Sequence, residues 1–152
     1  MKKEGIGMGF SNNSLGNIIL RVALGLFLLA YGIVTVQTNG TFAGLGGNEV
    51  AKAVGSFLKG DVADIVIILI GICAIVAGAG ILVSFFVPLG SAMGIFNTIV
   101  LVVWLVVIVL VDILGKGGLL NGAFGNFKAF TGFIQSFSLH AIVLGAMMTS
   151  RD

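Results

Sequence analysis

Charged residues are scarce in this chain. They make up 9% of the 152 residues, against about a quarter in a soluble domain, while 58% of the residues are hydrophobic. A water-soluble surface cannot be assembled from this composition, so the expected solvent is a lipid bilayer and the expected first partner is membrane lipid. The formal net charge of +2 is small and dispersed along the chain, which argues against a nucleic-acid partner.

Cysteine is almost absent, and so are the residue patterns of common enzyme classes. The single cysteine, Cys73, lies within an apolar run, which excludes a disulfide framework, a CxxC redox pair and a zinc-thiolate cluster. The sequence contains no HExxH motif, no Walker loop and no glycine-rich dinucleotide motif after a strand. We therefore expect no metal, no catalytic residues and no independent enzymatic activity.

What the chain does contain is four long apolar runs. They predict membrane-spanning helices over residues 16–36, 61–86, 89–114 and 134–148, the last reaching spanning length only with residues 130–133. Pro88 lies in the short connection between the second and third runs, which predicts an antiparallel hairpin. The predicted fold is an all-α membrane protein: four transmembrane helices in an up-and-down bundle, as one domain over residues 16–149. A polar segment (1–15) precedes it and a short tail (150–152) follows.

The first loop carries an amphipathic pattern. Val50, Val54 and Phe57 fall on one side of a helix, and Lys52 and Lys59 fall on the other. This spacing predicts a helix over residues 50–58 that lies on the membrane surface.

The second long loop is rich in phenylalanine, which recurs every three or four residues at Phe124, Phe127, Phe130, Phe133 and Phe137. Aromatic anchoring at the lipid interface and a ligand-binding box both fit this pattern. We predict an amphipathic helix over residues 124–133, on the same face as the helix in the first loop. Val54, Phe57, Phe127 and Phe130 should face the bundle or lipid, and the two helices should form a lid.

Two kinds of internal pattern concern packing and symmetry. Asn39-Gly40-Thr41-Phe42 is echoed by Asn121-Gly122-Ala123-Phe124, which predicts a repeat of two hairpins over residues 15–86 and 89–149. Small residues are spaced four apart at Ala74 and Gly78, Gly90 and Gly94, and Ala141 and Gly145. Such spacing lets helices approach closely in lipid and is typical of a tightly packed bundle or of contacts between subunits.

Six polar residues within or at the ends of the predicted spans are candidate ligand-binding residues: Arg21, Tyr31, Asp64, Asn97, Asp112 and His140. Arg21 lies near the end of its span, where it either reaches the headgroups or forms a buried pair. Asn97 lies near midplane, as an interhelical hydrogen-bond partner or in the lining of a cavity.

The other four residues should lie at similar depth near the non-cytoplasmic boundary. There, a carboxylate facing the imidazole would relay protons or bind a polar headgroup. Alternatively, the two aspartates are solvated residues at helix ends and His140 is hydrogen-bonded to a carbonyl.

The first span resembles the opening of the DoxX-like family, in the stretches Leu20-Arg21-Val22-Ala23-Leu24-Gly25-Leu26-Phe27 and Tyr31-Gly32. The resemblance implies a four-helix bundle in a bacterial plasma membrane, in a family linked to quinone-coupled sulfur oxidation and thiol redox complexes. The basic residues of the N-terminal flank, Lys2 and Lys3, predict that both termini are cytoplasmic.

Three functions remain open on the sequence. The first is a non-enzymatic accessory or scaffold subunit, which has few reactive groups and binds a protein partner or a second copy. The second is a quinone- or lipid-binding subunit of a redox system, which would make quinone the one cofactor to expect. The third is a small-solute transporter.

Overall fold

The regular structure in the described part of the chain is entirely helical. The computed structural model describes residues 12–37, 49–87 and 92–149. The long helices are α1 (Asn12–Val36), α3 (Asp61–Val83), α4 (Ala92–Ile108) and α5 (Phe127–Thr149), and a short helix, α2 (Glu49–Phe57), lies between α1 and α3. A π-helical segment, η1 (Val109–Leu114), continues α4 without a break.

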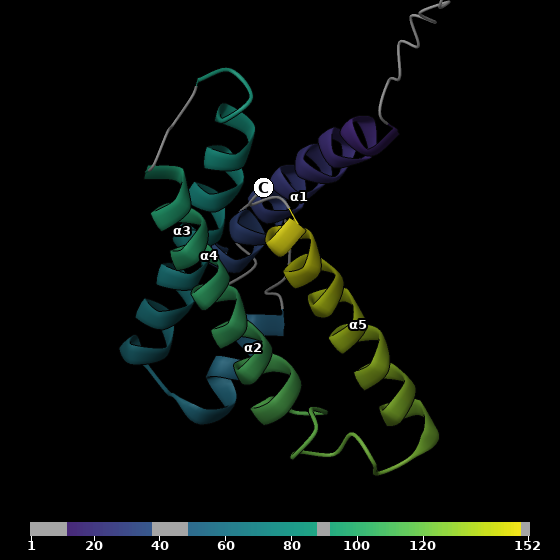
Figure 1. The fold of residues 1–152 in the computed structure, drawn as a ribbon. Coiled ribbons are helices and arrows are strands. Elements are labelled where there is room, and N and C mark those ends of the chain that lie inside the picture. The colour runs from purple at the N-terminus through teal and green to yellow at the C-terminus, as the bar shows by residue number, and fades with distance from the viewer. Residues whose placement is uncertain (1–11, 38–48, 88–91, 150–152) are drawn as a thin grey trace, which may run out of the picture.

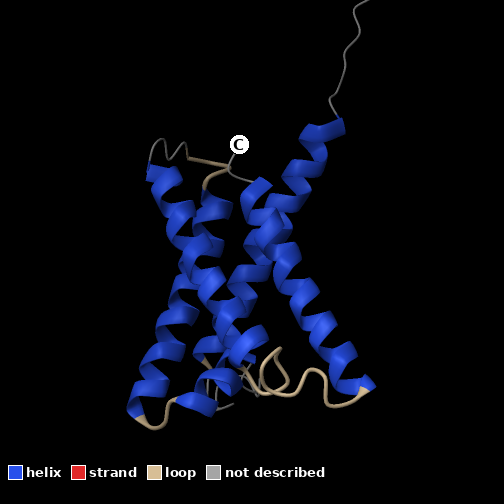
Figure 2. Cartoon of the chain, turned by 60° about the horizontal axis from the view of Figure 1, so that its bottom comes forward, coloured by secondary structure: helices blue, strands red, loops and turns tan. Residues whose placement is uncertain are grey.

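Four helices are long and apolar enough to cross a membrane, over Leu15–Val36, Asp61–Val83, Gly94–Leu114 and Phe127–Thr149. They run alternately up and down (Figure 1), and α2 lies with the loop of residues 115–126 at one end of the bundle (Figure 2). The all-α membrane fold with four spans is therefore confirmed, as is the first predicted loop helix.

Glycines bring α1 and α3 into backbone contact. A Cβ atom built on Gly78 would lie 2.5 Å from the carbonyl oxygen of Gly25, and one built on Gly32 would lie 2.6 Å from that of Gly71. The two pairs are seven residues apart on each antiparallel helix, so they fall on the same face of each helix two turns apart. Close approach of this kind holds helices together in lipid through dispersion contacts.

The second hairpin is packed more openly than the first. The α4–η1 span buries 11% of its most apolar stretch and α5 buries 22%, against 39% for α3. A Cβ atom added at Gly94 or at Gly145 would meet nothing within 4 Å. Of the small-residue positions predicted from four-residue spacing, Gly78 supports packing within the bundle, whereas Gly94 and Gly145 do not.

The prediction of a separate helix in the second long loop, over residues 124–133, was wrong. Residues 115–126 form turns, and the helix that starts at Phe127 continues without interruption to Thr149. Asn126 sets this start, because its side-chain Oδ1 accepts a hydrogen bond of 2.8 Å from the backbone N–H of Ala129, as an N-cap does. Phe127 is 81% exposed and begins the fourth span instead of lying in a lid.

The described helices differ from the predicted spans by a few residues at their ends. α3 ends at Val83, followed by turns at residues 84–86, and α1 begins at Asn12, inside the predicted polar segment. Pro88, Gly90, the Asn39–Phe42 half of the repeat and the tail 150–152 lie outside the described residues. The two-hairpin repeat therefore stays a prediction.

Candidate functional site

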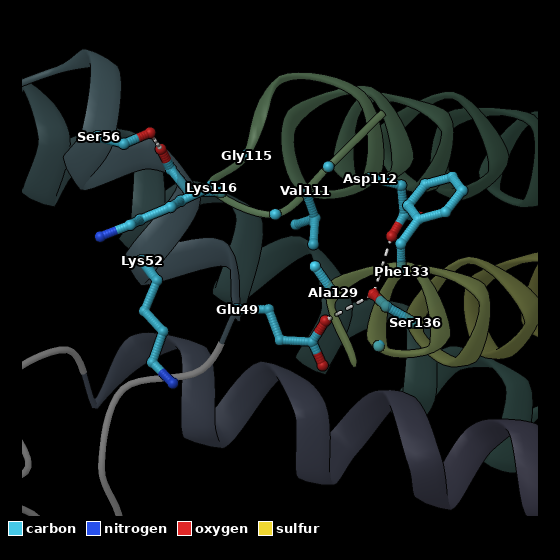
Figure 3. Close-up of a pocket in the computed structure, with 14 residues that line it drawn as sticks. Glu49, Lys52, Ser56, Val111, Asp112, Gly115, Lys116, Ala129, Phe133 and Ser136 are labelled. Carbon is cyan, nitrogen blue, oxygen red and sulfur yellow. Dashed lines mark hydrogen bonds between the residues drawn. The ribbon is translucent and has the colours of Figure 1, made fainter. Parts of the chain in front are cut away.

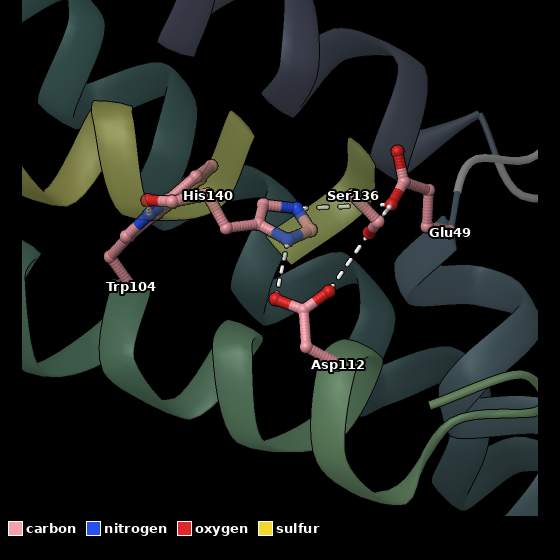
Figure 4. Close-up of polar contacts among 5 residues, drawn as sticks. All are labelled: Glu49, Trp104, Asp112, Ser136 and His140. Atoms are coloured by element: carbon pink, nitrogen blue, oxygen red, sulfur yellow. Dashed lines mark hydrogen bonds and ion pairs between the residues drawn. The ribbon is translucent and has the colours of Figure 1, made fainter. Parts of the chain in front are cut away.

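A buried histidine–aspartate pair lies near the end of the bundle that carries α2. His140 on α5 and Asp112 on η1 are 0% and 2% exposed, and His140 Nδ1 lies 2.7 Å from Asp112 Oδ2. Figure 4 shows the imidazole pointing at the carboxylate across the gap between the two helices. The predicted contact between the imidazole and a boundary carboxylate is therefore present for Asp112.

The π-helical winding of η1 places Asp112 on the buried face. Val107, on the preceding turn, is 1% exposed. In an unbroken α-helix the residue four positions later, Val111, would follow it on that face, whereas π-helical hydrogen bonds reach five positions and bring Asp112 there. The backbone carbonyl of Asp112 accepts a 2.7 Å hydrogen bond from the N–H of Leu119, so the following loop folds back against η1.

Ser136 and Glu49 extend the pair toward α2. The hydroxyl of Ser136, one turn before His140 on α5, lies 2.8 Å from Asp112 Oδ1 and 3.2 Å from Glu49 Oε2. Glu49 Oε2 also lies 3.8 Å from His140 Nε2. Four side chains from three elements therefore form one polar chain, Glu49–Ser136–Asp112–His140.

Aromatic residues separate this polar chain from the rest of the bundle. Trp104 is 2% exposed, stands edge-on to the His140 ring at a centroid distance of 5.6 Å, and donates its Nε1–H to the His140 carbonyl oxygen at 3.0 Å. Tyr31 on α1 packs against Trp104 at 5.3 Å. The indole thus fixes the backbone and the ring plane of His140 together.

Two buried polar atoms beside the polar chain have no hydrogen-bond partner among the described residues. They are His140 Nε2 and the hydroxyl oxygen of Tyr31. A buried polar group without a partner is costly, so an additional hydrogen bond at either atom would stabilise the structure.

A cavity of about 510 Å³ opens beside the polar chain, between α2, η1, the loop after η1 and the first turns of α5. Glu49, Asp112 and Ser136 line it together with Lys52 and Lys116. The remaining lining is small or apolar: Ala53, Ser56, Val111, Gly115, Gly117, Gly118, Ala129, Gly132 and Phe133. Its volume falls within the usual range of small-molecule sites, roughly 300–1,000 Å³.

The other predicted site residues lie elsewhere. Asp64 is exposed and lines a separate hollow formed by α2 and α3, which includes Lys59 and Gly60. Asp64 therefore does not pair with His140, because α3 turns Ala63 and Ile67 inward and leaves Asp64 outside. Tyr31 lies behind Trp104 and does not line the cavity.

Arg21 and Asn97 belong to the opposite half of the bundle. The Arg21 guanidinium lies 5.8 Å from the centre of the Phe85 ring, just past the end of α3, which agrees with the predicted boundary on the other side. Asn97 is partly buried, fifteen residues before Asp112 on a nearly continuous helix, or ~22 Å along its axis. Neither residue contributes to the polar chain.

Glu49, Ser136 and Trp104 are site residues that the sequence analysis missed. The signal for Glu49 was its place at the start of the amphipathic segment, and the signal for Ser136 was its spacing of four from His140. Trp104 is the only tryptophan in the chain and lies inside a predicted span. These signals give the helical face of each residue, but they do not show which helix that face meets.

The described residues of the site form neither a metal-ligand cluster nor a catalytic triad. Among the described residues, no group of three His, Cys, Asp or Glu side chains is arranged to hold a metal ion. The Ser136 hydroxyl contacts the aspartate instead of the imidazole, so it is not activated as a nucleophile in the manner of a catalytic triad. No protein-family model, curated protein or solved structure matches the chain.

Proposed function

We propose that this protein is a ligand-binding membrane subunit whose site is the cavity next to the polar chain Glu49–Ser136–Asp112–His140. The observation that carries the proposal is the cavity itself, which the carboxylates of Glu49 and Asp112 line together with Lys52 and Lys116. The imidazole is fully buried and held by Asp112 on one side, while its second nitrogen faces Glu49, a cavity-lining residue, without a hydrogen bond. His140 does not itself line the cavity, so a polar headgroup there acts on the imidazole only through Glu49 and Asp112, which do.

The ligand is a bilayer component with a polar head, either a quinone or a lipid. The residues that line the cavity lie on α2, η1, the loop after η1 and the first turns of α5, at the end of the spans, and its walls are largely apolar. Headgroups of membrane-dissolved molecules would lie at that level. Quinone binding agrees with the resemblance to the DoxX-like family. Placement in a bacterial plasma membrane with both termini cytoplasmic is part of the same proposal, and it puts the cavity on the outer side.

Filling the cavity should remove the ligand. A Cβ atom at Gly132 meets nothing within 4 Å, and Gly132 lines the cavity, so Gly132→Phe places a ring there without a backbone clash. Extraction of the purified protein followed by mass spectrometry should find a quinone or lipid at near-stoichiometric amounts in the wild type. The variant should lose it by about tenfold or more.

Gly16→Phe is the matched control, because Gly16 is equally open but lies near the far end of α1. This variant should retain the ligand. A wild type that carries no retained molecule, or a Gly132→Phe variant that keeps its full amount, would contradict the proposal.

A second candidate function, the accessory or scaffold subunit, is favoured by the open face of α5. Gly145 and the neighbouring Ile142, which is 67% exposed, leave a small-residue surface available to a partner helix. Gly145→Leu should then reduce the mass of the complex seen on native gels after mild detergent extraction, while leaving the Gly132-dependent ligand in place. A monomer in the wild type, with no co-purifying protein, would count against this function.

A further inference from the structure

The cavity separates charges of opposite sign. Figure 3 shows the ammonium ends of Lys52 and Lys116 at one end of the cavity, and Asp112 and Ser136 at the other. The Glu49 carboxylate lies between them and is turned toward Ser136, at 3.2 Å. In the described part of the chain, no ion pair joins either lysine to a carboxylate, so the two charge groups do not neutralise one another directly.

The acidic end holds two carboxylates and few hydrogen-bond donors. Ser136 has one hydroxyl proton, and its oxygen lies within hydrogen-bond distance of both Asp112 and Glu49. The hydroxyl can therefore donate a hydrogen bond to only one of the two carboxylates at a time. The two carboxylates of Glu49 and Asp112 outnumber the one histidine that lies against them. A buried or half-buried cluster with excess negative charge favours a cation that carries several donors.

The lysine end requires the opposite kind of group. Lys52 and Lys116 are both exposed and lie on different elements, α2 and the loop after η1, yet both line the same cavity. Two ammonium groups without a carboxylate partner at the mouth of a cavity favour an anion with several acceptor oxygens, such as a phosphate.

We propose that the site takes a zwitterionic phosphoamine, with its primary ammonium against Glu49 and the Ser136–Asp112 end and its phosphate between Lys52 and Lys116. The proposal rests on the function proposed above and names its ligand class. A primary ammonium offers three N–H donors, which suits the carboxylates that share one serine proton. The same chemistry occurs in the headgroup of an aminophospholipid and in free phosphoethanolamine.

Native mass spectrometry of the delipidated protein tests the ligand class without any substitution. Phosphatidylethanolamine should bind about tenfold more tightly than phosphatidylcholine, whose trimethylated ammonium has the same charge but no N–H donor. It should exceed phosphatidylglycerol, which lacks the ammonium, by a similar factor. The monomethyl and dimethyl lipids should fall between, in order of the number of donors that remain.

Matched variants locate the binding. Glu49→Gln and the double variant Lys52→Ala, Lys116→Ala should each weaken phosphatidylethanolamine binding by about tenfold. Asp64→Asn and Lys59→Ala remove the same charges from the separate hollow between α2 and α3 and should leave binding unchanged. Gly132→Phe should abolish it. Circular dichroism and gel filtration confirm that each variant is folded.

Calorimetry with free phosphoethanolamine separates the two sources of the headgroup. Binding of this probe with the same dependence on Glu49, but no binding of the lipid, assigns a soluble ligand and keeps the proposal. Equal binding of the three phospholipids, or no effect of Glu49→Gln in either assay, overturns it. If Gly132→Phe displaces a quinone or phosphatidylglycerol instead, the ligand-binding function stands and the zwitterion assignment falls. If no ligand depends on Gly132, both fall.

Discussion

Replacing Asp112 by alanine is expected to destabilise the bundle more than removal of any other carboxylate in the described residues. The change leaves His140 fully buried with neither ring nitrogen hydrogen-bonded, and it frees the Ser136 hydroxyl from its shortest contact. Loss of one partner of a buried, hydrogen-bonded pair costs on the order of 3 kcal/mol. Reversible unfolding in mixed micelles measures this loss in the free energy of unfolding.

Asp64→Ala is the control for that experiment, since Asp64 is an exposed aspartate near the same end of the bundle. Its effect should stay within about 0.5 kcal/mol. In the double variant Asp112→Ala, His140→Ala, the loss should be smaller than the sum of the two single losses, because each change removes the same contact. Additive losses, or a small effect of Asp112→Ala alone, would mean that the pair does not hold α5 against η1.

The second large effect is expected at Gly78, where a single methyl group should separate α1 from α3. The added Cβ would lie 2.5 Å from the Gly25 carbonyl oxygen and 2.7 Å from the Leu29 backbone nitrogen, and neither backbone atom can turn aside as a side chain can. Gly78→Ala should lower the free energy of unfolding by about 1–3 kcal/mol, the usual cost of overpacking. The same mixed-micelle unfolding measures it.

Gly94→Ala should have the opposite sign. A Cβ at this position meets nothing within 4 Å, so the change only replaces glycine in a helix by a better helix former. A gain of up to ~1 kcal/mol is expected. Equal effects at Gly78 and Gly94 would show that helix propensity, and not contact between α1 and α3, governs both positions.

For His140 and Asp112, the end of the bundle at which each lies could be predicted from the sequence, but the direction of a residue around its helix axis could not. Counting from the ends of the apolar runs placed His140 and Asp112 near the same boundary, and they are in contact. The same count placed Asp64 with them, yet Asp64 lies on the outer side of α3. α3 is apolar on nearly all sides, so its sequence carries no stripe to show which side faces inward.

The glycines that bring α1 and α3 together are seven residues apart, whereas the sequence analysis predicted contacts from a spacing of four. The four-residue spacing includes Gly78, Gly94 and Gly145, of which only Gly78 packs inside the bundle. Gly25 and Gly32 form the matching face on α1 with a spacing of seven, which returns to the same side of a helix after two turns. Their role depends on the opposing helix and is therefore visible only when both helices are in place.

Glu49 could not be assigned to the site for a related reason. The amphipathic pattern identified α2 correctly, and Val50 and Val54 are buried as that pattern requires. The pattern also assigns Glu49 to the polar side, where water is the default neighbour. Only the placement of α2 against η1 and α5 turns that polar side toward the cavity.

The π-helical segment η1 makes the direction of Asp112 depend on the number of residues that precede it in the helix. Its one extra residue per turn shifts every later side chain by about 100° relative to an α-helix of the same sequence. Deleting a single residue between Val109 and Asp112 would let the segment wind as an α-helix and restore the register that ends at Val107. The deletion does not change the directions of Trp104 and of the apolar outer face of α4, which precede it. With one residue fewer, Asp112 follows Val107 by four positions instead of five, as an α-helix requires for the same face. An insertion there would instead turn the Asp112 carboxylate away from His140 and toward lipid. The contact between Asp112 and His140 should therefore survive the loss of one residue better than the gain of one.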